Sequence, residues 1–468
     1  MMTNLDSISL VQKKKRPVKV LQFGTGNFLR GFADWMIEIL NEKTDFDGSI
    51  HIIQSHGKSI PEDFVRQNFN YHVFVRGFQN GNVVDEYKLI TSISGISNPN
   101  LDYGFYLDLA KNPDLEFIIS NTTEAGIVFD EKDTDPQKVP ASFPGKLAAL
   151  LYERFTFLEG NKTKGLTILP CELIENNGDK LKENVSRYAV LWNFPQEFIV
   201  WLDTTCTFCN TLVDRIVPGF PKENFEELEK KTGFVDHLAV VAEPYHFWAI
   251  EGPETLKFIF QTEKTGLNVH IVKDLQPYRL RKVRILNGAH TAMVPVAYLK
   301  GIRTVGEAIE DTFTSAFISG TIFKEIIPTL DLPQEELEQF AAEVLDRFRN
   351  PFIRHELISI SLNSISKFRV RVLPTILEYH SRIGQFPENL IRSFADLIRF
   401  FKGNINGESI PLKDEPAVLE FFEKVWKNEN KEDIIETVFS NKDLWGMDLS
   451  QIPGLGAKVN HYLKIDEN

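Results

Sequence analysis

The sequence predicts an α/β protein in which a doubly wound, parallel-sheet domain over residues 1–272 precedes a mainly α-helical domain over residues 273–468. Three observations lead to this prediction. An apolar strand, a glycine-rich turn and an amphipathic helix follow one another near the start of the chain. Patterns typical of buried strands then alternate with helical ones through most of the first domain. Beyond Asp274 the pattern changes to long helical periods.

Length and charge limit the classes of function. A chain of 468 residues is too long for one ordinary core, so two or more domains are expected. The formal net charge of −13 argues against a nucleic-acid partner, and an anionic substrate would need a local cluster of arginines. We find no apolar run of membrane-spanning length and no secretory signal. We therefore expect a cytoplasmic protein with no membrane partner, either a monomer or a homodimer.

The cysteines and histidines give no sign of a metal site. The chain has three cysteines, and the pair Cys206 and Cys209 has no second pair with which to complete a four-cysteine zinc site. The ten histidines show no HxxxH spacing. We interpret the cysteines as structural thiols and expect no metal; a zinc- or thiol-dependent enzyme is a remote alternative.

The first strand, Val18–Phe23, leads into the turn GTGNFL and then into an amphipathic helix. Gly24 permits a tight turn, and Gly26 lets main-chain N–H groups approach a pyrophosphate at the positive end of the helix. Leu29 stands where GxGxxG has its third glycine, so an ordinary tight turn remains the alternative. The predicted cofactor-binding residues of this segment are Phe23, Gly24, Thr25, Gly26, Asn27, Phe28 and Leu29, which give the first domain a Rossmann-like character.

The end of the second strand, Ile50–Gln54, bears on the choice of cofactor. An acid at this point would hold the adenosine ribose of NAD. The chain has Gln54 instead, with no acid before Glu62, and Lys58 could either face a 2′-phosphate or be a solvated loop charge. The predicted cofactor is NAD, and NADP is not excluded.

Further strands are predicted along the first domain. Asn80-Gly81 favours a hairpin turn before a β-rich stretch that ends at Ile96. Polar residues after two later strands, among them Thr123, Glu124 and Asn177, would lie at the ligand-binding edge of a parallel sheet. The later strands are predicted at Glu116–Ser120, Thr167–Cys171, Phe198–Trp201 and Ala239–Glu243.

The first long helix of the second domain carries Lys282, Asn287 and His290. On an α-helix, Asn287 lies about 140° and His290 about 80° around from Lys282, so all three could face one cleft. Gly288 costs roughly 1 kcal/mol relative to alanine within a helix, which suggests that something packs close to the backbone there. The alternative is an ordinary amphipathic helix with a solvated lysine. Other long helices are predicted at Val305–Ile318, Glu335–Phe348 and Pro387–Phe401.

Several motifs together resemble one family. They are the GxGNFxR loop, an Asn-Gly after a cysteine-containing strand, Val213-Asp214-Arg215-Ile216 and Lys-x4-Asn-x2-His. In this order they resemble the polyol-specific long-chain dehydrogenases, the mannitol dehydrogenase family. The forms SNTTEAGI, LPCELIENNG and RNPFIRHEL are most similar to members that reduce keto-hexuronates, which are small sugar acids, with NADH.

The resemblance implies a role for each matching residue. Lys282 would be the general acid in ketone reduction and the general base in alcohol oxidation. Asn177 and Asn287 would form the oxyanion hole, and His290 would orient the substrate. Asp214 and Lys367 match residues of the polyol site and Glu124 matches a strand-end glutamate, although Asp214 could equally pair with Arg215.

The chain departs from polyol-specific members just before Lys367, where Ser359 and Leu362 replace polyol-binding Arg and His residues. Arg369 and Arg371 follow Lys367, and a bidentate arginine suits the carboxylate of a uronate. We expect Arg369 to contribute to this substrate site, although these arginines could instead be salt-bridged surface groups. The alternatives are a mannitol or other polyol dehydrogenase, a fructuronate reductase and, more remotely, a non-catalytic NAD-binding sensor.

Overall fold

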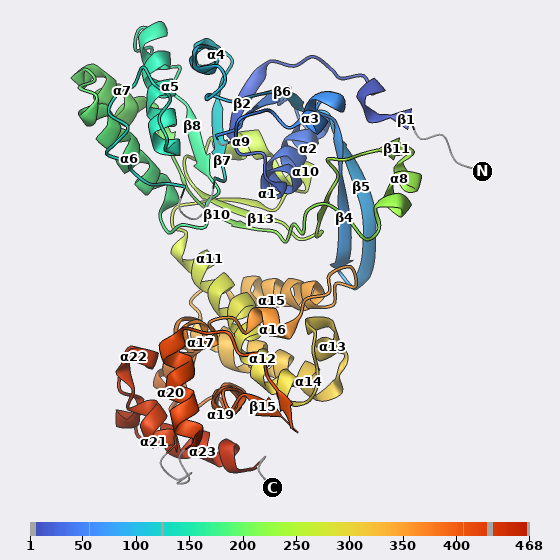
Figure 1. Ribbon diagram of the computed structural model, residues 1–468, viewed down its shortest axis with the longest axis vertical. Coiled ribbons are helices and arrows are strands. Elements are labelled where there is room, and N and C mark those ends of the chain that lie inside the picture. Colours follow the sequence, from blue (N-terminus) through green and yellow to red (C-terminus); the bar gives the residue numbers. More distant parts are fainter. Residues whose placement is uncertain (1–5, 56, 123–125, 406, 428–433, 466–468) are drawn as a thin grey trace. The chain divides into compact units, whose positions relative to one another are not determined.

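The computed structural model describes the chain except for residues 1–5, 56, 123–125, 406, 428–433 and 466–468 (Figure 1). The chain divides into two compact units. Unit 1 comprises Met1–Arg76 and Val84–Leu275, and unit 2 comprises Gly77–Val83 and Gln276–Asn468. Among the described residues, no helix is both long enough and apolar enough to cross a membrane.

A six-stranded sheet of parallel pairs organises unit 1. Its strands lie in the order β6-β3-β2-β7-β8-β9. The chain therefore starts in the middle, builds outward to one edge and then returns to build the other half, which is the doubly wound order of a Rossmann fold. The predicted α/β class is confirmed. The strands are β2 (Val18–Phe23), β3 (Ser49–Ile53), β6 (Ile93–Ser97), β7 (Phe117–Ser120), β8 (Thr167–Pro170) and β9 (Thr207–Phe208).

Both faces of this sheet are buried, because successive side chains of a strand point to opposite sides. Val20 and Leu169 pack into one hydrophobic cluster, whereas Leu21 and Ile168 pack into another. Helix α2 (Trp35–Lys43) contributes to the first cluster. The second cluster is covered by α5, α6 and α7, which lie together beside β8 in Figure 1. Their bounds are Phe143–Phe157, Asn177–Leu191 and Gln196–Thr205.

One strand prediction was wrong. Residues 198–201, expected to form a strand, lie within helix α7. The buried residues Phe198, Trp201 and Leu202 are spaced as on one face of a helix. The prediction failed because a short apolar run is compatible with either a strand or a helix.

Other strands form smaller sheets. The hairpin turn at Asn80-Gly81 is confirmed, because both residues have positive φ, at 51° and 77°, between β4 and β5. Strand β12 pairs in parallel with β4, and β10 pairs with β13, which in turn pairs with β14. The bounds are Tyr71–Gln79 (β4), Asn82–Ile90 (β5), Asn210–Asp214 (β10), Val240–Ala242 (β12), Phe247–Glu251 (β13) and Val269–Val272 (β14).

Unit 2 is mainly helical, as predicted. Helix α12 packs against α19, and the Ser393 hydroxyl donates to the Ala292 carbonyl at 2.7 Å between them. The predicted helix over residues 305–318 breaks at Asp311, whose side chain caps the second half. Its helices include α11 (Gln276–Arg281), α12 (Ala289–Leu299), α13 (Val305–Glu310), α14 (Thr312–Gly320), α15 (Gln334–Phe348), α16 (Leu357–Ile360), α17 (Ser364–Arg371), α19 (Glu388–Phe400) and α22 (Lys442–Trp445).

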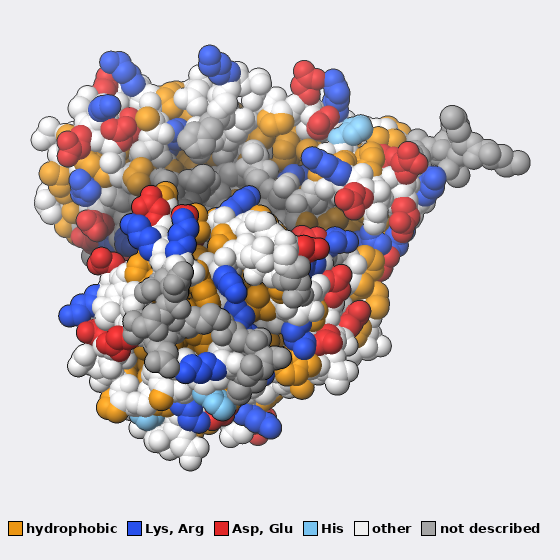
Figure 2. All heavy atoms as spheres, turned by 60° about the horizontal axis from the view of Figure 1, so that its bottom comes forward, with side chains coloured by type: hydrophobic (Ala, Val, Ile, Leu, Met, Phe, Trp, Pro, Cys, Tyr) orange, Lys and Arg blue, Asp and Glu red, His pale blue; other side chains and the backbone are white. Residues whose placement is uncertain are grey.

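Charges of both signs are spread over one face of the molecule. On the face shown in Figure 2, acidic and basic side chains are interspersed among the described residues. This mixture fits a chain whose 52 basic and 65 acidic residues are distributed along its whole length.

Candidate active site

The predicted dinucleotide turn lies where the strand order reverses, between β2 and β7. Gly24 has a φ of +130°, and a Cβ added to it would lie 3.0 Å from the Asn121 carbonyl oxygen and 3.2 Å from Leu29. The turn is pinned by the Gly24 N–H, which donates to the Ile53 carbonyl at 3.1 Å. Since ligands of doubly wound sheets bind at this reversal point, the turn lies where a dinucleotide is expected.

The helix after the turn begins at Asn27, with Gly26 as its N-cap, and a Cβ at Gly26 would meet nothing within 4 Å. Segments α1 (Asn27–Leu29), the π-helical turn η2 (Arg30–Asp34) and α2 form one continuous helix. Its first N–H groups and the open space at Gly26 fit a pyrophosphate. Leu29, at the position of the third glycine of GxGxxG, is buried. The close packing of the helix occurs instead at Gly31, where an added Cβ would lie 2.9 Å from Val217.

A buried polar chain supports the turn from behind. Gln22 donates to the Gly24 carbonyl at 3.2 Å, and the Tyr71 hydroxyl donates to the Asp34 carboxylate at 2.5 Å. Burial raises the pKa of Asp34 to about 7, against the opposing effects of Tyr71, Arg30 and Gln22. These contacts fix the main chain on which the cofactor would rest.

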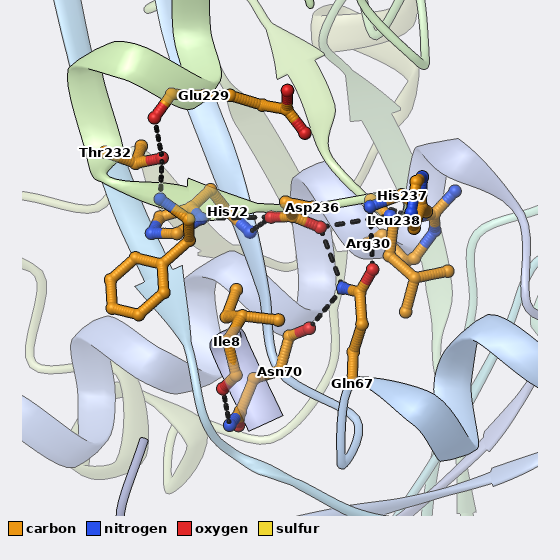
Figure 3. A network of polar contacts seen from close by, with 11 residues as sticks. Ile8, Arg30, Gln67, Asn70, His72, Glu229, Thr232, Asp236, His237 and Leu238 are labelled. Atoms are coloured by element: carbon orange, nitrogen blue, oxygen red, sulfur yellow. Dashed lines mark hydrogen bonds and ion pairs between the residues drawn. The ribbon is translucent and has the colours of Figure 1, made fainter. Parts of the chain in front are cut away.

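The Arg30 side chain links the turn to a second network, drawn in Figure 3. Its guanidinium donates to the Asn27 side chain at 2.6 Å and to the Leu238 carbonyl. Near Leu238, the buried Asp236 carboxylate accepts hydrogen bonds from the main-chain N–H of His72 at 2.6 Å and from the side-chain amide of Gln67 at 2.8 Å. The geometry of the turn therefore depends on groups remote from it in sequence.

The end of β3 carries Gln54, which is half-buried, and no acid. Its N–H donates to the Ser97 carbonyl at 2.8 Å. Glu62 pairs with Arg66 at 2.6 Å within an exposed helical turn, and Lys58 is exposed. The predicted cofactor residues Thr123 and Glu124 lie outside the described residues.

Asn177 requires a correction. Its side chain is 1% exposed, and its Nδ2 donates to the carbonyls of Pro170 (2.9 Å), Glu172 (3.1 Å) and Thr211 (3.3 Å). Its Oδ1 accepts from the N–H groups of Gly178 and Thr211 at 2.9 and 2.8 Å. Both N–H hydrogens and both acceptor positions are used, so the amide offers no donor to a substrate oxygen.

A carboxylate that the sequence analysis missed lies beside it. Glu172 is 3% exposed and accepts from the Ser120 hydroxyl and the Thr122 N–H, both at 3.0 Å. It therefore joins the ends of β7 and β8, and burial raises its pKa. An acid directly after an apolar strand was the signal that could have identified it.

Asp214 ends strand β10 and is 7% exposed. Arg215 directs its guanidinium to main-chain carbonyls, those of Glu243 at 2.9 Å and Gly31 at 2.7 Å. Burial lowers the pKa of Arg215 to about 9. Arg215 thus bonds to two main-chain carbonyls, and the predicted place of Asp214 in the substrate site stays a prediction.

In unit 2, the helix that carries Lys282, Asn287 and His290 differs from the predicted α-helix. Residues Lys282–Gly288 form a π-helical turn, η4, between α11 and α12. A π-helix bonds residue i to residue i+5, so Lys282 and Asn287 are successive neighbours along one side of the turn. On an α-helix they would point well apart. Such π-turns occur frequently at functional sites.

Close packing holds this turn in place. A Cβ at Gly288 would lie 3.3 Å from the Arg371 carbonyl oxygen, which confirms the predicted approach to the backbone. Two residues further on, His290 stacks on Phe348, with ring centroids 4.2 Å apart, and meets His355 edge-on at 5.3 Å. Burial lowers the pKa of His355.

The two arginines after Lys367 point in different directions. Lys367 and Arg371 are four residues apart on α17 and share a face, whereas Arg369 lies on another side. Arg369 donates to the Asp443 carbonyl of α22 at 3.2 Å. Arg371 instead approaches the Thr291 hydroxyl on α12 at 3.5 Å, so it, not the predicted Arg369, adjoins the helix of Lys282.

Burial and a neighbouring positive charge both act on Lys367. Burial, followed by the charge of Arg371, lowers the pKa of Lys367, against the raising effect of Asp414. Its ammonium donates to the Ile360 carbonyl at 2.8 Å. The four-residue spacing between Lys367 and Arg371 was the sequence signal that could have favoured Arg371 over Arg369 as the neighbour of Lys367.

Metal and thiol chemistry find no support in the described part of the chain. No group of three or more His, Cys, Asp or Glu residues there could hold a metal ion. The three cysteines are buried, and burial raises the pKa of Cys206 and of Cys209 to about 12. Thiols in such surroundings are unreactive.

A glycine turn at the reversal point of a doubly wound sheet is typical of nicotinamide-dependent oxidoreductases. Comparison with known proteins specifies the group. Residues 18–263 match the mannitol dehydrogenase Rossmann domain, and residues 274–465 match the mannitol dehydrogenase C-terminal domain. The chain therefore belongs to the mannitol dehydrogenase family and is an oxidoreductase that acts on CH–OH groups.

Relatives in that family are highly similar. Altronate oxidoreductase of Bacillus subtilis (strain 168) is 48% identical over 96% of this chain and 92% of its own length. That of Yersinia enterocolitica is 44% identical over 96% and 95%. Among solved structures, a D-sorbitol dehydrogenase has a TM-score of 0.83 at 22% identity, covering 100% of this chain and 97% of its own, and so shares the fold.

Proposed function

We propose that this enzyme interconverts a keto-hexuronate and its hydroxy acid, tagaturonate and altronate, with NADH and NAD. One observation carries the proposed chemistry: the π-turn that makes Lys282 and Asn287 neighbours on one side of a helix. The similarity to altronate oxidoreductases, at 48% identity over 449 residues, supports the substrate.

Reduction of the ketone requires a hydride at carbon and a proton at oxygen. NADH would supply the hydride. Lys282 would donate the proton to the carbonyl oxygen in reduction and accept it in oxidation, while the Asn287 amide would stabilise charge developing on that oxygen. His290, held by its stacking on Phe348, would orient a substrate hydroxyl group.

The substrate carboxylate would bind at the face shared by Lys367 and Arg371. The lowered pKa of each group indicates that it would gain from a bound anion: burial lowers both, and Arg371 further lowers that of Lys367. A planar guanidinium can hold a carboxylate through two hydrogen bonds. This face replaces Arg369 in the proposed site.

The cofactor is proposed to be NAD, held at the turn of Gly24 and Gly26. Gln54, at the end of β3, has no charge with which to repel a 2′-phosphate, so the preference over NADP is expected to be modest. Replacing Gln54 with aspartate should therefore increase the preference for NADH.

The test is a substrate panel with the purified full-length chain. Tagaturonate, fructuronate and fructose would each be offered with NADH and with NADPH, and the loss of reduced-cofactor absorbance followed. Turnover of tagaturonate well above the other two supports the proposal. Turnover of fructose but neither uronate would select a polyol dehydrogenase, and a preference for fructuronate would select that reductase. No turnover with any of them would leave an NAD-binding sensor, which cofactor binding without catalysis would reveal.

A further inference from the structure

A cavity lies in unit 1, at the amino ends of β2, β3 and β6. It has a volume of about 480 Å³, within the range of small-molecule sites. Its walls come from the N-terminal segment Ser9–Arg16 and from the start of β6, with Ser49 and Asn68 between them. The dinucleotide turn lies at the carboxyl ends of the same strands. Since a strand of five or six residues spans roughly 17–20 Å, the two sites are separate.

The cavity is positively charged in a chain whose net charge is −13. Four consecutive basic residues, Lys13–Arg16, line it. One carboxylate, Asp47, is shared by Lys14 at 2.8 Å and Arg16 at 3.4 Å. Lys15 forms no ion pair among the described residues. The cavity therefore holds more positive charge than its neighbours neutralise.

The second acid near the cavity is already engaged. Glu38 is 4% exposed and accepts from the Thr91 N–H, the Thr91 hydroxyl and the Ser92 N–H, each at 2.8 Å. Lys13 donates to the Ile93 carbonyl at 2.8 Å, and burial lowers its pKa to about 8, against the raising effect of Glu38. An anion in the cavity would stabilise the charged form of Lys13.

A buried hydroxyl points to the kind of ligand. Ser92 is 1% exposed and lines the cavity, and its Oγ finds no hydrogen-bond partner among the described residues. Leaving a buried donor without a partner is unfavourable, and the oxygen of an anion would accept from it. The main-chain and side-chain donors around it suit a group with several acceptor oxygens.

We propose that this cavity binds a small phosphate-bearing molecule, with Ser92 donating to the phosphate and Lys13 and Lys15 neutralising it. A phosphate offers three acceptor oxygens and close to two negative charges, which match one hydroxyl and two ammonium groups. The ligand would lie at the amino ends of the strands, whereas the cofactor would lie at their carboxyl ends. The site is independent of the substrate assigned above.

Calorimetric titration of the full-length chain with pyrophosphate tests this site. The titration is made at constant ionic strength and with saturating NADH, so that the dinucleotide turn is occupied. One bound pyrophosphate per chain is expected. Ser92→Ala and Lys15→Gln should each weaken binding by about tenfold, the usual effect of losing a hydrogen bond to a charged group.

The matched control is Lys132→Gln, which removes the same charge from an exposed loop of unit 1 and should leave binding unchanged. All three variants should keep the melting temperature and the turnover of the unmodified enzyme. Binding that is equal in every variant would mean an adventitious ion only and would overturn the proposal, as would no binding at millimolar pyrophosphate. Citrate binding as tightly as pyrophosphate would overturn the assignment of a phosphate.

Discussion

The side-chain amide of Asn177 exchanges two hydrogen bonds with the main chain of Thr211. The Thr211 N–H donates to Oδ1 at 2.8 Å, and Nδ2 donates to the Thr211 carbonyl at 3.3 Å. The next residue, Gly178, approaches the Cys209 carbonyl so closely that a Cβ would lie 2.4 Å from it. Asn177-Gly178 is thus the joint between α6 and β10, and its sequence is explained by packing.

Asn177→Ala is expected to destabilise the fold. It leaves the buried N–H of Thr211 without its acceptor, and such losses cost roughly 1–3 kcal/mol for each unsatisfied group. A lower melting temperature, measured by circular dichroism, should accompany the substitution. Lys180→Ala, an exposed change on the same helix, should have little effect. A variant with unchanged melting temperature but greatly reduced kcat would instead restore Asn177 to the oxyanion hole.

Lys282→Ala should remove the proton donor while leaving the fold intact. We expect kcat to fall by about 10²–10⁴-fold, the usual contribution of general acid–base catalysis. Adding methylamine to the assay should restore part of the activity, because a free amine can occupy the vacated space. Lys413→Ala, at an exposed position of unit 2, serves as the control. A Lys282→Ala enzyme with normal turnover would contradict the proposed mechanism.

Arg371 and Arg369 form a matched pair for substrate recognition. Arg371→Met should raise the KM for a keto-hexuronate by about 10–100-fold, because hydrogen bonds to a carboxylate are worth roughly 1.5–3 kcal/mol. Arg369→Met removes the same charge from a side chain directed toward Asp443 and should leave KM nearly unchanged. Steady-state kinetics of both variants decide the matter. A larger increase in KM for Arg369→Met than for Arg371→Met would instead assign carboxylate binding to Arg369.

The buried carboxylate of Asp34 should make stability depend on pH. Its folded-state pKa is raised from 3.8 to about 7 by burial, so the folded protein holds a proton that the unfolded chain has already released. Its contribution to stability is therefore fully present below about pH 4 and is lost as the pH rises through about 7. The melting temperature of Asp34→Asn, relative to that of the unmodified enzyme, should rise across this window. Parallel pH profiles of the two proteins would contradict this assignment.

The local pattern of the sequence was sufficient for the turn and for most of the elements. The apolar strand before Gly24, the Asn80-Gly81 hairpin and the long helix that ends at Phe348 all depend on neighbours close in sequence, which explains why they could be predicted. The failure at Phe198–Trp201 has a similar origin, because four apolar residues fit either period.

By itself, the sequence determined the fold class, the dinucleotide turn and the presence of Lys282, Asn287 and His290 on one helix. Only the tertiary structure decided how those residues are arranged. The π-turn at Lys282–Gly288 accompanies close packing against the Arg371 carbonyl, which belongs to a helix more than eighty residues away. Likewise, saturation of the Asn177 amide depends on Thr211, and the choice between Arg369 and Arg371 depends on which helix each one meets. Hydrogen bonding and close packing between distant segments are set by the fold as a whole, so no local pattern could have revealed them.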